Sequence, residues 1–82
     1  MPELSNFYGI RITINMEDHN PPHIHAAYAE FKAIFDIKNI NLIKGKFPNK
    51  AQYLVLEWIT LHQNELLSIW DTENIHKIPP LI

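Results

Sequence analysis

The sequence contains no cysteine among its 82 residues. This absence excludes a disulfide framework and any metal site built on thiolate ligands, and it fits a protein of the reducing cytoplasm. No apolar run approaches the roughly 18 residues that a membrane-spanning helix needs. The N-terminal stretch MPELSNFYG lacks the basic and apolar segments of a signal peptide. We therefore expect a cytoplasmic protein with no membrane association.

Positive charge is also scarce, with seven basic and nine acidic residues and a net charge of −2. Such a balance argues against a strong non-specific nucleic-acid binder, which needs clustered positive charge. The distribution is uneven, however, because five lysines and a single acid, Asp36, lie between Lys32 and Lys50. This mid-chain segment is either a set of solvated lysines or a small patch for an anionic ligand or RNA.

The composition is that of one small globular domain, 1–82, with 46% hydrophobic and 20% charged residues. Alternation of apolar and polar residues predicts strands in FYGIRITINM, with Tyr8 directed inward, in HIHAAY and in FKAIFDIK. The segment LIKGK is predicted to form a short fourth strand or an extended arm. We expect an antiparallel meander of three to four strands within residues 7–45.

From Pro48 the apolar period changes to that of a helix, which we expect to run over about 48–72 and to be followed by an irregular tail, 73–82. The apolar face of this helix comprises Ala51, Leu54, Val55, Trp58, Leu61, His62, Leu66, Ile69 and Trp70. His62 is expected to be packed and His76 exposed. The predicted fold class is α+β, with one long C-terminal helix packed on one face of the sheet.

The stretch HNPPHIH holds three of the five histidines, His19, His23 and His25. If Tyr28 lies opposite Phe31 in a tight hairpin, His23 pairs with Asp36 and His25 with Ile34. Strand parity then predicts a polar sheet face, directed away from the helix, that carries Arg11, Thr13, Asn15, His23, His25, Lys32, Asp36 and Lys38. The two prolines restrict the placement of His19 relative to His23.

Three interpretations of these histidines stay open. His23 and His25 could bind a metal with His19 or Asp36 as a third ligand, because imidazole and carboxylate suit zinc and related metals. They could instead act as general acid and base, since histidine titrates near neutrality and a carboxylate can orient it. Alternatively, they are strand residues that are structural or contact a partner, with no chemistry of their own.

Several segments together resemble the bacterial family known as domain of unknown function 4160: FYGIRI, DHNPPHIHA, AEFKAIFDI, GKFP and the helical LVLEW…LH…ELL…W. The resemblance covers nearly the whole chain, and DHNPPHIHA is its most specific part. It implies a short prokaryotic protein whose gene often lies in a toxin–antitoxin-like pair. It also marks Asp18, His19, His23 and His25 as motif residues. The family name assigns no activity. The family typically has a glycine where this chain has Ala29.

These observations lead to two functional hypotheses. The first is a toxin–antitoxin-type component that acts on or binds RNA, as a metal-independent ribonuclease if it is an enzyme. In this hypothesis His23 and His25 are acid and base, and His19 or Asp36 orients them, while phosphate is held by Arg11, Lys32 and Lys38. Its partner would be a small antitoxin-like protein, and an exposed sheet edge would permit a homodimer. The second hypothesis is a non-enzymatic protein-binding module with an optional histidine-bound metal; the sequence names no other cofactor.

Overall fold

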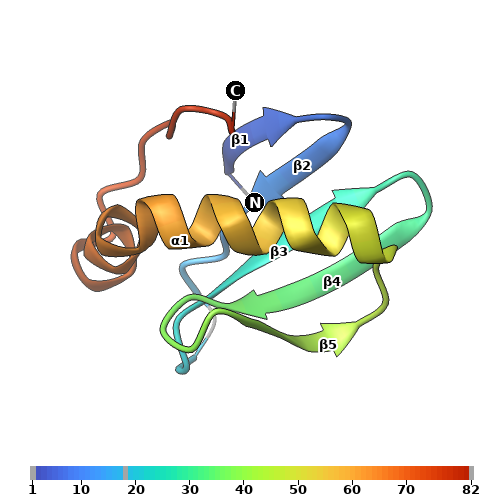
Figure 1. The fold of residues 1–82 in the computed structure, drawn as a ribbon. Coiled ribbons are helices and arrows are strands. Elements are labelled where there is room, and N and C mark those ends of the chain that lie inside the picture. The colour runs from blue at the N-terminus through green and yellow to red at the C-terminus, as the bar shows by residue number, and fades with distance from the viewer. Residues whose placement is uncertain (1, 18, 82) are drawn as a thin grey trace.

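The computed structural model describes residues 2–17 and 19–81. Within this part of the chain a five-stranded sheet precedes one helix, in the order β1 (Glu3–Phe7), β2 (Ile10–Thr13), β3 (His23–Tyr28), β4 (Phe31–Asp36), β5 (Asn41–Gly45) and α1 (Asn49–Thr72). Each strand pairs antiparallel with the next, and α1 crosses one face of the sheet (Figure 1). The α+β class is confirmed, and the sheet has five strands rather than three or four.

The extra strand comes from an N-terminal hairpin, where the sequence predicted one continuous strand from Phe7 to Met16. Tyr8 and Gly9 both adopt positive φ angles, 52° and 79°, which is typical of a tight two-residue hairpin loop. The chain reverses there and pairs Phe7 with Ile10. Phe7 is buried while Tyr8 is 56% exposed, so the predicted inward position of Tyr8 is wrong.

The hairpin of β3 and β4 has the register that the sequence predicted. Its cross-strand pairs are Tyr28–Phe31, Ala26–Ala33, Ile24–Phe35, His25–Ile34 and His23–Asp36. Ala29 in the turn has φ of 53°, a left-handed conformation that costs a residue with a Cβ atom about 1–2 kcal/mol. The tight turn forms here in spite of this cost.

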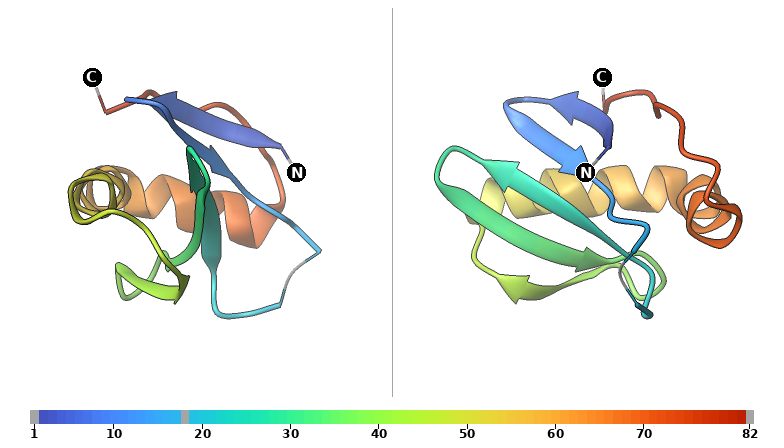
Figure 2. Two further views of the ribbon diagram at one scale, coloured as in Figure 1. Left: turned by 90° about the vertical axis from the view of Figure 1, so that its right-hand side faces the viewer. Right: turned by 180° about the vertical axis from the view of Figure 1, so that it is seen from behind.

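The helix α1 packs its apolar face on the sheet, and most of the predicted positions are buried. Its buried residues are Ala51, Val55, Trp58, Ile59, Leu66 and Ile69. Leu61 is 64% exposed, which corrects the prediction that it belongs to the buried face. The helix is interrupted at His62, where φ is −119° and ψ is 19°. Its second half therefore turns sharply away from the first (Figures 1 and 2).

The segment after α1 packs back against the first strand. The Ile78 backbone N–H donates to the Leu4 carbonyl at 2.8 Å, and the indole Nε1–H of Trp58 donates to the Pro79 carbonyl at 2.9 Å. Ile78 is buried as a result. The tail thereby covers part of the outer edge of β1. Among the described residues, no helix combines the length and apolar character needed to span a bilayer.

Candidate functional site

The face of the sheet opposite α1 is hollowed. The hollow has a volume of about 620 Å³, and its lining residues are Arg11, Thr13, His25, Ala26, Ala27, Lys32, Ala33, Ile34, Lys44 and Gly45. Strand pairing orders the side chains on this face into two rows: Arg11–Ala27–Lys32 and Thr13–His25–Ile34–Lys44. Because neighbouring strands lie about 4.8 Å apart, the Cα atoms of Arg11 and Lys32 are roughly 10 Å apart across the hollow. Four of the ten lining residues are alanine or glycine, and their small size leaves the space.

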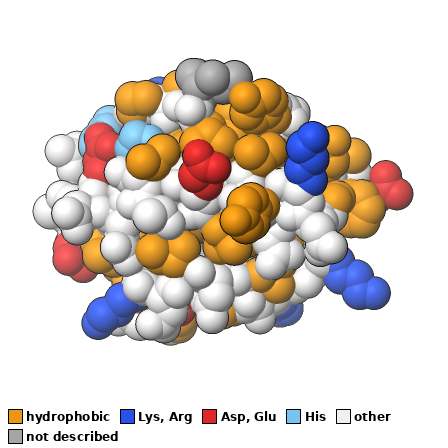
Figure 3. Space-filling view, in the orientation of Figure 1, with side chains coloured by type: hydrophobic (Ala, Val, Ile, Leu, Met, Phe, Trp, Pro, Cys, Tyr) orange, Lys and Arg blue, Asp and Glu red, His pale blue; other side chains and the backbone are white. Residues whose placement is uncertain are grey.

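Three cationic side chains surround the floor of the hollow. Arg11 comes from β2, Lys32 from β4 and Lys44 from β5, and no acidic residue is among those that line it. The Nε atom of Arg11 lies 3.1 Å from a carboxylate oxygen of Glu3, in a pair whose arginine is 59% exposed. Exposed pairs contribute about 0–1 kcal/mol, so Arg11 can still bind an external phosphate. The opposite, helix side carries its basic side chains singly among apolar and uncharged ones (Figure 3).

Lys44 belongs to the basic segment between Lys32 and Lys50, but the sequence did not assign it to the open face of the sheet, where it lines this hollow. Gly45 adopts φ of 91°, and a Cβ atom at that position would lie 2.3 Å from the Lys32 carbonyl oxygen. The glycine therefore permits a close approach of β5 to β4, which brings Lys44 opposite Ile34. The pairing shifts between Ile34 and Phe35, so parity counted along LIKGK could not assign Lys44 to a face.

His25 lies near the centre of the hollow and is half-buried. It pairs across the sheet with Thr13 on one side and Ile34 on the other. The imidazole ring of His25 lies 5.4 Å, centroid to centroid, from that of His23. His25 is thus the histidine of the motif that the fold places among the cations.

His23 has a different environment from His25, although the two share strand parity. It is buried, and its ring lies 5.2 Å from that of Trp70, in the second half of α1. Its Nδ1 atom lies 2.8 Å from the Pro21 carbonyl oxygen; since a carbonyl can only accept, Nδ1 carries the proton in this contact. His23 thus shares the predicted sheet face with His25. The prediction that this face leaves His23 away from the helix is wrong, because Trp70 in the second half of α1 packs against it.

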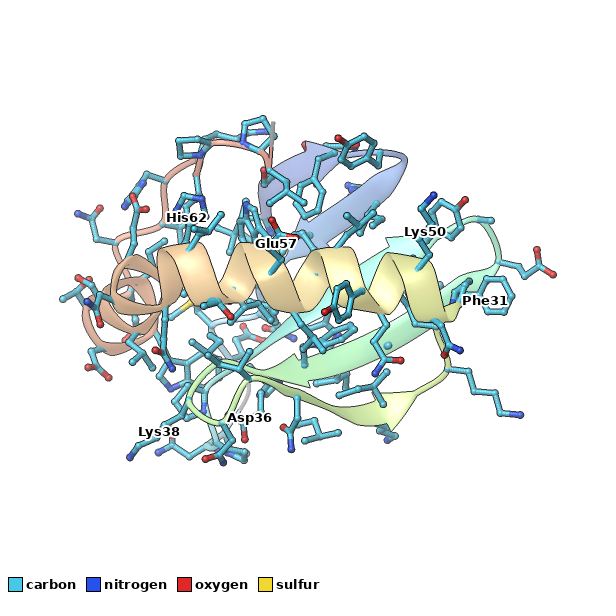
Figure 4. The ribbon with its side chains drawn as sticks, viewed as in Figure 1. Phe31, Asp36, Lys38, Lys50, Glu57 and His62 are labelled. Carbon is cyan, nitrogen blue, oxygen red and sulfur yellow. The ribbon has the colours of Figure 1, made fainter. Side chains whose placement is uncertain are left out.

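Asp36 and Lys38 lie at the end of β4, outside the hollow (Figure 4). The Asp36 carboxylate accepts hydrogen bonds from the backbone N–H groups of Lys38 and Asn39 at 2.8 and 2.9 Å, and from the Asn39 amide at 3.2 Å. Asp36 is 4% exposed, and these bonds order the turn into β5. The side chain of Lys38 is exposed. Neither residue joins the three cations that the fold assembles.

His19 is exposed in the loop before β3, and Asp18 lies outside the described residues. The loop is tied to α1, because the indole Nε1–H of Trp70 donates to the side-chain oxygen of Asn20 at 3.0 Å. The Asn20–Pro21 peptide bond is cis. Over residues 2–17 and 19–81, no three histidine or acidic side chains form a group that could hold a metal ion.

A second pair of histidines lies outside the motif, on the helix side. Nδ1 of His62 is 3.5 Å from a Glu65 carboxylate oxygen, and Nδ1 of His76 is 3.9 Å from the other. His62 also packs on Trp58, with ring centroids 5.4 Å apart. His62 is packed and His76 is exposed, as the sequence predicted, and the spacing of His62 and Glu65 along one helix face explains their contact.

Comparisons with known proteins complete the description of this face. No curated protein and no solved structure matches the chain. The family model described as "Domain of unknown function (DUF4160)" matches residues 9–71. The match includes the motif and all three cations of the hollow. Because it spans more than half of the sequence, the chain belongs to this family of domains of unknown function.

Proposed function

We propose that the protein binds RNA through the hollow of the open sheet face. The observation that carries this proposal is the convergence of Arg11, Lys32 and Lys44 around His25, with no acid among the lining residues. Three strands contribute one cation each, so their grouping depends on the folded sheet. A protein of net charge −2 thereby presents one locally positive surface, which is the electrostatic footprint of phosphate-backbone recognition.

The shape of the hollow favours a single strand of RNA over a small anionic metabolite. Small-ligand pockets usually enclose most of their ligand, whereas this hollow is an open depression across four strands. Arg11 offers the planar donor fork that suits phosphate. The imidazole of His25 and the side chain of Ile34 supply a surface on which an unpaired base can stack.

The arrangement supports binding better than cleavage by a histidine pair. Acid–base cleavage of a phosphodiester needs both groups within hydrogen-bond reach of the reacting atoms. His25 lines the hollow, but His23 is buried against Trp70 and its Nδ1 contacts the Pro21 carbonyl oxygen. We therefore place His25 as a base-stacking residue. A role for the protein in a toxin–antitoxin pair would act through this binding.

Fluorescence anisotropy with a labelled single-stranded RNA of mixed sequence tests the proposal. We expect a dissociation constant of about 10⁻⁶–10⁻⁴ M at physiological salt. Three phosphate contacts on a single strand give a slope of about −2 in log affinity against log salt. The variant Lys32→Glu/Lys44→Glu should weaken binding at least tenfold.

A matched control is Lys38→Glu/Lys50→Glu, which changes the net charge equally. Lys38 and Lys50 lie at opposite ends of the molecule and outside the hollow (Figure 4). The control should weaken binding less than threefold. Equal losses in the two double variants would contradict a site in the hollow, and so would binding that does not depend on salt. Gel analysis of the same RNA reports cleavage, which we expect to be absent.

A further inference from the structure

The two outer edges of the sheet differ in whether they are covered. The edge of β1 is partly covered by the C-terminal tail, because the Ile78 backbone N–H donates to the Leu4 carbonyl. In the described part of the chain, β5 pairs only with β4. β5 lies at the outer edge of the sheet (Figure 1, and Figure 2, right). The outer backbone groups of β5 are therefore a template on which another strand can pair.

The two sides of β5 have opposite character. On the helix side, between β5 and the start of α1, lies a groove of about 420 Å³ lined by Phe31, Leu42, Gly45, Lys46, Phe47, Pro48 and Gln52. On the open side, Lys44 projects at the border of the hollow. A strand added to β5 would alternate its side chains between these two environments, because successive residues of a strand point to opposite faces.

The positive charge around β5 indicates which kind of strand can pair with its free edge. From Ile37 to Leu56 the chain carries Lys38, Lys44, Lys46 and Lys50 and no acidic residue. Pairing of β5 with a second copy of itself would place two copies of Lys44 and of the adjoining Lys46 along one short strand pair, which is unfavourable because like charges repel across a strand pair. The lysines and the shift in pairing of β5 protect the edge from neutral and basic strands, and they leave an acidic strand as the complementary occupant.

We propose that an extended acidic segment of a partner protein adds to the edge of β5 as a sixth strand. Its apolar side chains alternate with carboxylates: the apolar ones enter the groove beside Leu42 and Phe47, and the carboxylates face Lys44. Backbone hydrogen bonds supply affinity and the alternating side chains supply specificity, as in other cases of strand addition. This site shares Lys44 and Gly45 with the hollow, but its backbone hydrogen bonds and its groove contacts do not depend on RNA binding.

A fluorescent peptide that alternates glutamate and valine tests the proposal on the intact protein. It should bind and slow amide hydrogen exchange in β5 (Asn41–Gly45). Two control peptides have the same composition, one with the residues in two blocks and the other N-methylated at alternate positions. Each control should bind at least tenfold more weakly, because the first lacks the alternation and the second lacks the backbone donors. A peptide with lysine in place of glutamate should not bind measurably.

Protein variants separate this site from the RNA site. Lys44→Glu should lower the affinity for the alternating peptide at least fivefold, whereas Lys50→Glu should change this affinity less than twofold. Arg11→Ala, on β2, should lower the affinity for RNA and leave the affinity for the peptide unchanged. The proposal is overturned if block or N-methylated peptides bind as well as the alternating one. It is also overturned if protection appears outside β5, or if sedimentation shows that the free protein dimerises through this edge.

Discussion

The two faces of the sheet are made from the same strands but differ in size of side chain, charge and covering. Toward α1 the sheet places large, fully buried residues such as Ile12, Ile24 and Phe35. On the other face the same strands place Arg11, Ala27 and Lys32 around an open hollow. A period of two along each strand thus places alternate residues in the buried core and on the face that we propose binds RNA.

This contrast explains how so short a chain can carry a site. A domain of this size buries only about 60% of its unfolded surface, so the helix-covered face must hold nearly all the large apolar side chains. The open face is free to carry small and basic residues at little cost to the core. Substitutions on the helix-covered face should therefore change mainly stability, and substitutions on the open face should change mainly the affinity for RNA.

The largest effect should come from Trp58, the largest fully buried side chain, which contacts Phe7 with ring centroids 5.7 Å apart and donates to the Pro79 carbonyl. Trp58→Ala should lower the free energy of unfolding by about 3–5 kcal/mol, measured by urea denaturation. The control Leu61→Ala, on the exposed side of the same helix, should cost less than about 0.5 kcal/mol. Similar losses in both variants would contradict the burial pattern of α1.

Asp36 should give the next largest effect, and on stability alone. Asp36→Ala removes the acceptor of three hydrogen bonds in the turn before β5 and should cost about 2 kcal/mol in thermal or urea denaturation. Asp71→Ala, at an exposed helix position, is the control and should be near neutral. A variant at Asp36 that folds normally but fails to bind RNA would instead restore the role first predicted for it beside the histidines.

Substitutions of the two motif histidines, which lie on the same strand, should affect different quantities: RNA affinity for His25 and stability for His23. His25→Ala should weaken RNA binding by about 1 kcal/mol through lost stacking, roughly fivefold in affinity, with little change in stability. His23→Ala should lower stability by about 1 kcal/mol, because it removes the contact with Trp70, and should change affinity less. The reverse pattern in anisotropy and denaturation would show that His23 is the binding residue.

The smallest effect should be a gain at the turn between β3 and β4. Ala29→Gly relieves the left-handed strain at φ of 53°, offset by the entropy that glycine loses on folding, so the net stabilisation should be about 0.5 kcal/mol. Ala27→Gly, in the adjoining strand, should be destabilising by a similar amount. A loss of stability in Ala29→Gly would contradict the tight turn.

Strand alternation, together with an assumed tight turn that places Tyr28 opposite Phe31, predicted the pairing of β3 with β4. Alternation also grouped His25 with Arg11 and Lys32 on one face of the sheet. The N-terminal hairpin was missed because apolar alternation continues through Tyr8 and Gly9, and Tyr-Gly is not a common hairpin dipeptide. Alternation also could not place Lys44, because the register shifts within the pairing of β4 and β5.

The environment of His23 depends on a feature with no local sequence cause. Kinks usually follow proline, glycine or an inserted group, and α1 contains neither proline nor glycine. Its interruption at His62 nevertheless carries Trp70 to His23 and Asn20. Contacts of this kind join residues about fifty positions apart, and periodicity within a strand or a helix holds no information about them.

Methyl NMR during titration with single-stranded RNA tests the central claim most directly, since Ile34 and Ile24 lie on neighbouring strands but on opposite faces of the sheet. Ile34 lines the hollow, whereas Ile24 is fully buried. We predict that the methyl signals of Ile34 and Ala27 shift progressively with RNA while those of Ile24 and Ile59 stay unchanged. Shifts confined to the helix side, or equal shifts on both faces, would contradict binding in the hollow.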